Sequence, residues 1–369
     1  MAFMPRPLPI GLDIGRHTVR MLQLSGSGRD LRVVDAAKFT IPEEAKADAL
    51  RRRPVIVENV RRLVRERHFR RREVVAALAD DQIGVRNVRM PRMADEELGT
   101  AVNWEAQNKF PFDTTTAVIQ HVRAGEVRQA DQVFDEIILF AAPRDEIERI
   151  TQIIAEAGLE LVSLDAKPCA VFRGFERFLL RRDDANVVSV FVDLGARTTV
   201  LITRGREIVF VKTVPIGGEL FNRSVAECLE LAPAESEALR RRIGRRTEAE
   251  GEGNEAPGRV RRAVEDAIRP HVEDLANEIG LCLRYYAVTF HKSRPETVVF
   301  TGGEAHNAGL PEALAARLGV EATIADPLRG VRTDHLGPVL DRRGCLSEWT
   351  TAFGLSLKGM ILAEQLRAG

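Results

Sequence analysis

The sequence predicts an α/β protein with mixed sheets, organised in two lobes. Segments with strand-like and helical patterns alternate along the chain, which is typical of this class. At 369 residues, the chain is also longer than a single compact core usually accommodates. A third observation is a repeated pattern, strand–Asp-x-Gly–strand, which occurs as "IGLDIGRHTVRMLQL" at 10–24 and as "VSVFVDLGARTTVLITRG" at 188–205. Two copies of one hairpin indicate two lobes of similar construction.

The individual elements follow from their periodicity. Short apolar runs rich in β-branched residues predict strands at 10–14, 19–24, 74–79, 137–141, 159–164, 187–193, 199–203, 208–214 and 297–300. Apolar residues repeating every three or four positions predict helices at 55–67, 95–109, 143–157, 168–180, 218–231, 260–290, 310–318 and 348–366. Trp104 and Trp349 lie on two of these helical patterns, and we expect both to be packing residues.

The composition excludes several classes of function. Acidic and basic residues balance at 54 each, so the overall charge favours neither nucleic acid nor an anionic membrane as partner. The four cysteines are scattered without paired spacing, which predicts a reducing cytoplasm and no zinc site. No apolar window is long enough for a spanning helix, and the first residues lack the core of a signal peptide. We expect a cytoplasmic protein that reaches a membrane surface only through a partner.

Two charged stretches stand apart from the α/β pattern. Residues 240–260 contain few large apolar side chains and predict a surface loop or a disordered insertion. Residues 51–72 carry ten arginines on an amphipathic pattern. They indicate either a surface for an anionic partner or a well-solvated helix face, and the interspersed glutamates favour the second interpretation.

The repeated hairpin has a chemical interpretation. An unpaired carboxylate is costly inside a core, so Asp13 is expected where a strand ends, and Gly15 is expected to adopt a positive φ in a tight turn. Clustered amide groups of such turns bind phosphate oxygens. Asp13 and Asp193 would then hold a hydrated Mg²⁺, which prefers one or two carboxylates plus waters. Nearby residues that complete this predicted site for a nucleoside triphosphate are Gly195, Thr18, Thr198 and Thr199. A single such hairpin would be unremarkable, and the repeat carries the interpretation.

Two pairs of glycines extend the predicted site. Gly217 and Gly218 follow a strand and open a helix, where amide groups and the helix dipole favour an anion. Gly302 and Gly303 follow the strand at 297–300, and they would let a flat ring approach the backbone closely. Each pair alone is weak evidence, because strand-to-helix turns use glycine for packing as well.

The order of these motifs resembles the actin and sugar-kinase superfamily, with phosphate loops at 11–20 and 191–200 and an adenosine motif at 299–303. Within it, the chain is similar to the PilM family of type IV pilus assembly. The segments that carry this likeness are "AVNWEAQNKFPFD" at 101–113, "VPIGGELFNRSVAE" at 214–227 and "GLPEALAARLGVEATIADPLRGV" at 309–331. The resemblance covers about 10–357, with 240–260 unmatched.

This resemblance implies a two-lobed actin-like (RNase H-like) ATPase fold, with a small α+β subdomain inserted in lobe one. Lobe one would combine 9–75, a connecting segment at 150–185 and the return at 332–369, while 76–149 forms the insert and 186–331 forms lobe two. Proteins of this family bind the cytoplasmic N-terminal peptide of PilN, an inner-membrane pilus protein, in a groove around the insert. The implied function is an ATP-binding component of a type IV pilus or type II secretion-like platform. Further platform proteins or copies of the chain are other implied partners.

Three residues depart from the family pattern and leave two alternatives open. Arg16, His17 and Arg197 stand where the family has small residues. Arginine can contact phosphates directly, which would keep the nucleotide site in use. Alternatively, these bulky side chains fill the phosphate space and leave a nucleotide-free scaffold.

Enzymatic activity is at most slow ATP hydrolysis. It would need a residue that orients the attacking water, and Asp165 is the candidate for this catalytic role. Its alternative role is a charge near the start of the helix that Pro168 opens. A cell-division protein of the FtsA type would share most motifs, but it should end in a tail with a membrane-binding helix. This chain instead follows its last helix with "LKGMILAEQLRAG", so we favour the PilM type.

Overall fold

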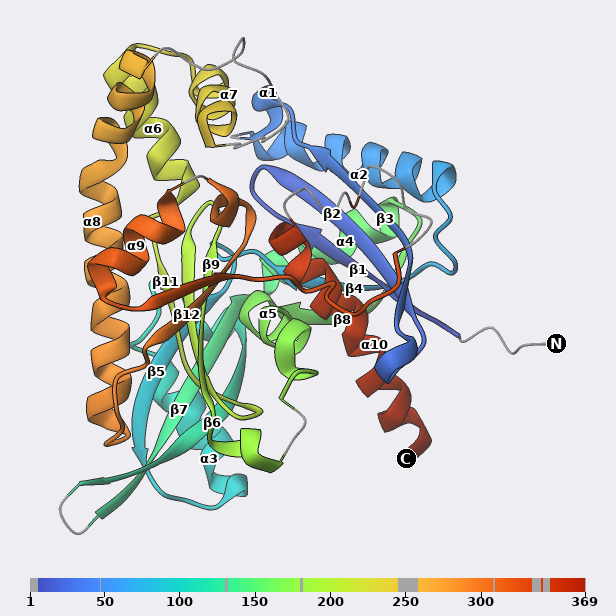
Figure 1. Cartoon of the computed structure of the whole chain (residues 1–369). Coiled ribbons are helices and arrows are strands. Elements are labelled where there is room, and N and C mark those ends of the chain that lie inside the picture. Colours follow the sequence, from blue (N-terminus) through green and yellow to red (C-terminus); the bar gives the residue numbers. More distant parts are fainter. Residues whose placement is uncertain are drawn as a thin grey trace.

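Two sheets of the same design form the body of the protein, and a third stands beside them (Figure 1). The computed structural model describes residues 6–46, 48–129, 132–179, 182–244, 258–307, 309–333, 340 and 346–368. The strand orders of the three sheets are β3-β2-β1-β4-β8, β11-β10-β9-β12-β13 and β5-β7-β6. We call the first sheet with its helices lobe one and the second sheet with its helices lobe two.

The two five-stranded sheets repeat the same topology. Each starts with an antiparallel meander of three strands and adds two strands parallel to its first one. Lobe one contains β1 (Pro7–Ile14), β2 (Thr18–Ser25), β3 (Arg32–Thr40), β4 (Glu73–Leu78) and β8 (Glu160–Ala166). Lobe two contains β9 (Val188–Leu194), β10 (Thr198–Arg204), β11 (Glu207–Val214), β12 (Thr297–Thr301) and β13 (Glu321–Ile324). The repeated hairpin therefore begins two equivalent sheets, as the sequence predicts.

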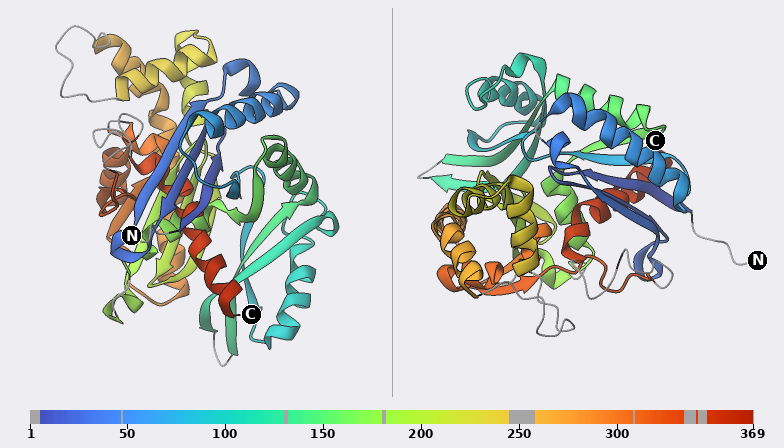
Figure 2. Two further views of the ribbon diagram at one scale, coloured as in Figure 1. Left: turned by 90° about the vertical axis from the view of Figure 1, so that its right-hand side faces the viewer. Right: turned by 90° about the horizontal axis from the view of Figure 1, so that it is seen from above.

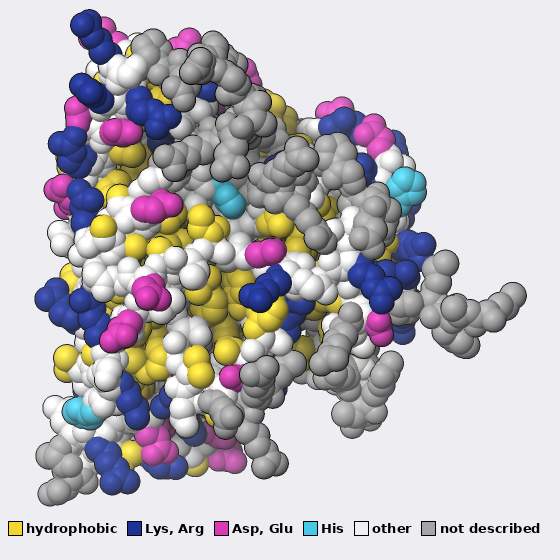
Figure 3. Space-filling view, viewed as in Figure 1, with side chains coloured by type: hydrophobic (Ala, Val, Ile, Leu, Met, Phe, Trp, Pro, Cys, Tyr) yellow, Lys and Arg dark blue, Asp and Glu magenta, His cyan; other side chains and the backbone are white. Residues whose placement is uncertain are grey.

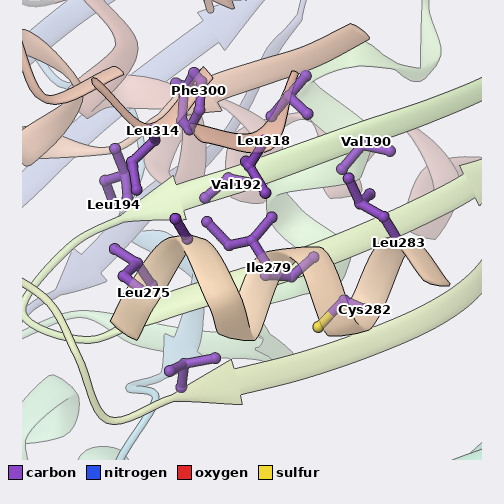
Figure 4. Packing of buried hydrophobic residues seen from close by; sticks show 14 of the residues in the cluster. Val190, Val192, Leu194, Leu275, Ile279, Cys282, Leu283, Phe300, Leu314 and Leu318 are labelled. Carbon is purple, nitrogen blue, oxygen red and sulfur yellow. The ribbon is translucent and has the colours of Figure 1, made fainter. Parts of the chain in front are cut away.

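Helices cover the sheets. The longer helices of lobe one are α2 (Ala49–Glu66), α4 (Arg144–Glu156), α5 (Lys167–Glu176) and α10 (Thr350–Ala368), with α1 (Glu43–Lys46) before α2. Lobe two has α6 (Gly218–Leu229), α7 (Pro233–Gly244), α8 (Gly258–Thr289) and α9 (Leu310–Leu318). Short 3₁₀ turns lie at Gly28–Asp30, Thr114–Thr116, Arg182–Asn186, Gly303–His306 and Leu346–Trp349. Figure 4 shows how α8 buries Ile279 and Leu283 in the same apolar cluster as Val190 and Val192 of β9.

The third sheet forms the inserted unit (Figure 2). Its strands are β5 (Gly84–Pro91), β6 (Ala117–Gln129) and β7 (Gln132–Pro143), and α3 (Asp95–Ala106) shares their apolar cluster. The predicted bounds of 76–149 were too wide at both ends. Residues 76–78 belong to β4, and α4, which begins at Arg144, packs Ile147 and Ile150 into the core of lobe one.

Polar elements account for most differences from the predicted secondary structure. The strands β3, β5, β6 and β13 and the helix α7 were not predicted, because charged residues interrupt or cover them. The predicted loop at 240–260 is narrower, since α7 extends to Gly244 and α8 starts at Gly258; positions 245–257 lie outside the described residues. Arg240, expected on the surface, is only 3% exposed.

Charge is distributed as the composition suggests. Figure 3 shows basic and acidic side chains interspersed over the face seen in Figure 1, without a field of one sign. On and after α2, Arg53 pairs with Glu156, and Arg67 pairs with Asp35. These pairs agree with a solvated helix face for the arginine-rich stretch. In the part of the chain that the structure describes, no helix is long and apolar enough to cross a membrane.

Candidate functional site

The site lies where the carboxyl ends of the parallel strands of both lobes converge. Asp13 lies near the end of β1, Asp80 follows β4, and Lys167 directly follows β8. From lobe two, Asp193 lies near the end of β9. The Lys167 ammonium is 2.8 Å from Asp80 Oδ2 and 2.7 Å from Asp193 Oδ2. One lysine therefore joins the carboxylates of the two lobes.

The charges of this cluster are buried and mutually compensated. Burial lowers the affinity of Lys167 for its proton, but the neighbouring Asp193, Asp80 and Asp13 raise its pKa overall, so it stays an ammonium. Burial raises the pKa of Asp13, and the nearby Arg20 and Lys167 only partly oppose this effect. The guanidinium of Arg20 lies 3.7 Å from Asp13 Oδ2.

Arg20 links this cluster to the chain's return to lobe one. It donates to Glu348 Oε2 at 2.8 Å, and Lys38 binds the other oxygen of the same carboxylate. Although burial alone would raise the pKa of Glu348, Arg20 and Lys38 hold it below its ordinary value. The pair therefore ties the first hairpin to the 3₁₀ turn Leu346–Trp349.

The first turn, between β1 and β2, is held by a side chain from α2. Arg52 donates to the carbonyl oxygens of Gly15 at 2.8 Å and Arg16 at 2.9 Å. The amide of Gly15 donates to the carbonyl of Thr18, at the start of β2. The expectation of a positive φ at Gly15 is wrong, because neither Gly15 nor Gly195 belongs to the left-handed glycines of the described chain. An added Cβ on Gly15 would instead lie 3.0 Å from the Thr18 carbonyl oxygen.

Arg16 and His17 reach from the first turn to lobe two. Arg16 lies 3.3 Å from Glu219 on α6, and His17 Nδ1 lies 3.5 Å from Glu237 on α7. Lys46 also contacts Glu237, at 2.5 Å. Burial alone would raise the pKa of Glu237, but His17 and Lys46 outweigh it and lower the pKa to about 2. Two of the three departures from the family pattern, Arg16 and His17, thus contact carboxylates of lobe two.

The second turn, between β9 and β10, is held by backbone groups. Gly195 donates to the carbonyl of Arg197, two positions further on, whereas Gly15 of the first turn donates to Thr18, three positions further on. The amides of Gly218 and Glu219, at the start of α6, donate to the carbonyls of Gly195 at 2.9 Å and Ala196 at 3.2 Å. The amide of Gly218, one of the two residues expected to favour an anion, is therefore already engaged. A Cβ on Gly217 would lie 2.7 Å from the Ala196 carbonyl oxygen, so this glycine permits a close approach.

Three polar side chains line the second turn and the strand that follows it. Thr199 Oγ1 donates to Asp80 at 3.4 Å. Thr198 is fully buried, and its hydroxyl has no hydrogen-bond partner within the described ranges. Arg197 is half-buried and makes no side-chain hydrogen bond or ion pair to any described residue. Thr198 and Arg197 therefore retain hydrogen-bonding capacity. Thr18, the equivalent of Thr198 in the first turn, is also buried.

The predicted adenosine motif packs against the end of β9. Gly302 has φ +89°, and a Cβ there would lie 2.4 Å from the Leu194 carbonyl oxygen and 2.5 Å from Asp193 Oδ1. At Gly303, the nearest atom to a Cβ would be Nη2 of Arg20, at 3.7 Å. Gly302 is thus required by the fold itself, and Gly303 leaves space beside Arg20.

Two further residues close this side of lobe two. Glu304 packs over Gly218, where a Cβ would lie 2.5 Å from its Oε1, and it accepts a hydrogen bond of 2.6 Å from the buried Arg240. Arg240 also donates to the carbonyl of Gly218. Sequence reasoning placed Arg240 in a loop because its neighbours are polar, and no local signal marks it as buried.

Asp165, predicted as the catalytic residue, is engaged elsewhere. Its Oδ2 accepts from Arg173 at 2.8 Å, and Lys358 lies 3.4 Å from Oδ1. Lys167, two positions later, is the residue that reaches the cluster. Asp80 and Lys167 were missed, although Asp80 directly follows the predicted strand at 74–79 and Lys167 lies just beyond the one at 159–164. The rule that ligands bind beyond the carboxyl ends of such strands could have indicated them.

Mg²⁺ does not fit the arrangement that the aspartates adopt. Asp13 and Asp193 do come together, as predicted, but Lys167 and Arg20 already neutralise them. Across the described residues, no group of three His, Cys, Asp or Glu side chains could hold a metal ion. Bound Mg²⁺ usually keeps several waters, and the Lys167 ammonium already lies 2.7 Å from the Asp193 carboxylate that would hold the ion.

Comparison with solved structures defines the class of protein. Two sheets of equal topology whose Asp-x-Gly turns meet between the lobes form an actin-like ATPase fold. The structure titled "PilM-PilN type IV pilus biogenesis complex" has a TM-score of 0.77 at 23% identity, covering 96% of this chain and 99% of that one. The ethanolamine utilization protein EutJ from Carboxydothermus hydrogenoformans gives a TM-score of 0.56 at 16% identity, covering 96% and 90%. MreB5 of Spiroplasma citri bound to ADP gives 0.51 at 12% identity, covering 99% of both chains.

The family is more specific than the fold. The family of the type IV pilus assembly protein PilM matches residues 11–360, and the chain belongs to this family. The fold class and the family that the sequence predicts are therefore confirmed, and the protein has a role in type IV pilus assembly.

Proposed function

We propose that this protein is a cytoplasmic adaptor of the inner-membrane platform of a type IV pilus, or of a related type II secretion-like system. In this role it binds the cytoplasmic N-terminal peptide of a PilN-like membrane protein and attaches to the membrane through that partner. The observation that carries the proposal is the similarity, over nearly the whole of both chains, to a structure titled as a complex of PilM with PilN.

The inserted unit offers a surface suited to a partner. Trp104 projects from α3 with 76% of its surface exposed, so the expectation that it packs in the core is wrong. Trp349, by contrast, is 1% exposed and buried as predicted. Exposed tryptophans are rare on a monomer, and tryptophan is enriched among the residues that contribute most to interfaces. This supports the insert as the unit that contacts a platform protein.

Two fluorescence readouts measure peptide binding: the anisotropy of a label on the peptide and the quenching of the protein's own tryptophans. The peptide is a labelled N-terminal segment of the PilN-like protein from the same host, and a scrambled peptide is the control. We expect its anisotropy to rise on binding, and iodide quenching of Trp104 to fall if the peptide covers α3; the buried Trp349 contributes little to quenching. Saturable binding of the scrambled peptide, or no binding of either, would contradict the proposal.

ATP binding is part of the proposal, and it is supported by the groups left unengaged beside the second turn. Arg197 and Thr198 retain hydrogen-bonding capacity next to Asp193, and guanidinium groups bind phosphate oxygens well. We expect Arg197→Gln to lower the affinity for ATP in calorimetry by about tenfold. Arg223→Gln, an exposed arginine on α6, is the matched control.

A nucleotide-free scaffold is the second candidate. It is favoured by the amides of Gly218 and Glu219, which are already bonded to the second turn. In that case ATP would give no binding heat with wild-type protein, while the PilN-like peptide would still bind.

A further inference from the structure

Lys167 occupies the centre of the carboxylate cluster. Its ammonium donates a charge-assisted hydrogen bond of 2.8 Å to Asp80 of lobe one and forms an ion pair with Asp193 of lobe two at 2.7 Å. The Lys167 side chain is 16% exposed, and those of Asp80 and Asp193 are 11% and 7% exposed. A cation between carboxylates of two lobes offsets their mutual repulsion and holds them together, as a shared divalent ion would.

The backbone around Lys167 is fixed by packing against lobe two. Lys167 is the first residue of α5, and two phenylalanines of that helix, Phe172 and Phe175, contact Phe191 of β9 with ring centroids 6.4 and 5.0 Å apart. The second turn also lies close, since a Cβ on Gly195 would be 3.5 Å from Lys167 Nζ. The lysine is therefore held in the cluster from both lobes.

On one side of the ammonium, no room is left for a hydrated ion. The gap bounded there by Lys167, Asp193 and Thr199 is too small to admit a water molecule. A divalent cation would have to displace the ammonium, and Lys167 would then be a buried charge without its carboxylates, which is costly.

We propose that Lys167 takes the place of the divalent cation in this protein, as a fixed internal counter-ion between the carboxylates of the two lobes. Association of the lobes then needs no Mg²⁺. If the nucleotide of the proposed function binds, it binds with little dependence on Mg²⁺.

The first test uses Mg²⁺ alone and requires no nucleotide. Thermal unfolding is followed for the full chain with MgCl₂ and with NaCl of equal ionic strength. We expect no difference for wild type. Lys167→Met leaves Asp13, Asp80 and Asp193 short of one positive charge, so Mg²⁺ should raise its Tm by about 3 °C or more.

Two controls make this test specific. Lys358→Met removes a lysine that is also largely buried and paired with an aspartate, Asp165, and Mg²⁺ should not raise its Tm. Wild-type protein is also titrated with MgCl₂ by calorimetry, which does not depend on any variant folding. Saturable Mg²⁺ binding to wild type that is lost in Asp193→Asn would overturn the proposal, as would a Lys167→Met protein that folds but does not respond to Mg²⁺.

The second test measures ATP affinity of wild type in MgCl₂ and in EDTA, and it rests on the proposed function. We expect the two values to agree within about threefold. A loss of about tenfold or more in EDTA would refute the inference. If ATP binds in neither buffer, the proposed nucleotide binding fails, whereas the result with Mg²⁺ alone still decides the role of Lys167.

Discussion

The two Asp-x-Gly turns share a sequence pattern, yet different groups hold them. In the first turn, the guanidinium of Arg52 binds the carbonyls of Gly15 and Arg16. In the second turn, the equivalent carbonyls of Gly195 and Ala196 bind amides at the start of α6. The side chains differ as well, because Arg16 pairs across the lobes while Arg197 has no partner in the described chain.

The first turn is therefore held by charged side chains, whereas the second turn is held by close packing of backbone groups. Ion pairs respond to salt and pH, and exposed ones contribute little to stability. A close backbone approach responds to neither, but it tolerates no added atom. We therefore expect the first turn to be adjustable by solution conditions and the second turn to be rigid. Four changes probe this comparison, in order of decreasing effect.

The largest effect is expected from glycine substitution. Gly217→Ala places a Cβ 2.7 and 2.8 Å from two carbonyl oxygens of the second turn, whereas Gly15→Ala meets one carbonyl oxygen at 3.0 Å. We expect Gly217→Ala to cost about 3 kcal/mol of unfolding free energy and Gly15→Ala about 1 kcal/mol or less. Urea unfolding of both variants measures this, and equal costs would contradict the distinction between the turns.

The next effect is a pH dependence at Glu237, whose pKa falls from 4.5 to about 2 in the folded protein. A depressed carboxylate pKa stabilises the fold above the unfolded value, and this stability is lost as pH falls through the folded value. Wild type should therefore lose about 2 kcal/mol more than Glu237→Gln between pH about 4.5 and about 2. Unfolding curves at several pH values measure it; parallel pH profiles would refute it.

Removing the guanidinium that holds the first turn should have a moderate effect. Arg52→Met leaves two carbonyl oxygens without their donor, at a cost of about 1–2 kcal/mol. Its neighbour on α2 provides the control, because Arg51 is 68% exposed in its side chain and pairs only with the exposed Asp48. Arg51→Met should change thermal stability little. If both variants behave alike, Arg52 does not support the turn.

The smallest effect is expected for the ion pair between the lobes. The side chains of Arg16 and Glu219 are 38% and 34% exposed, so Arg16→Gln should cost about 0.5 kcal/mol, and less at high salt. A double-mutant cycle with Glu219→Gln isolates the pair. Arg197→Gln should change stability by less than Arg16→Gln does, because no ion pair is lost. A coupling energy that does not fall with salt would argue against a solvent-screened contact.

The sequence predicted the fold well where apolar periodicity was strong. The repeated hairpins, the helices α4, α8 and α9 and the glycine of the adenosine motif were all indicated by local pattern. Polar elements were not predicted, because β13 is exposed along its whole length and α7 is rich in arginine and glutamate. The partners of Asp13 and Asp193 were missed for a different reason. Asp80 and Lys167 come from strands that become neighbours only after the sheet of lobe one has formed.

By itself, the sequence determined the two lobes and the positions of the two turns, because hydrophobic period and glycine placement are local properties. The family was indicated by the resemblance of whole segments, such as 101–113, to known proteins. Only the tertiary structure decided which charges meet. Lys167 lies 26 residues before Asp193 in the chain and 87 after Asp80, so no spacing rule links them. Because these charges are buried, the fold depends on their pairing: a charge removed from water is costly unless an opposite charge lies nearby. In this protein, that charge is an ammonium of its own chain.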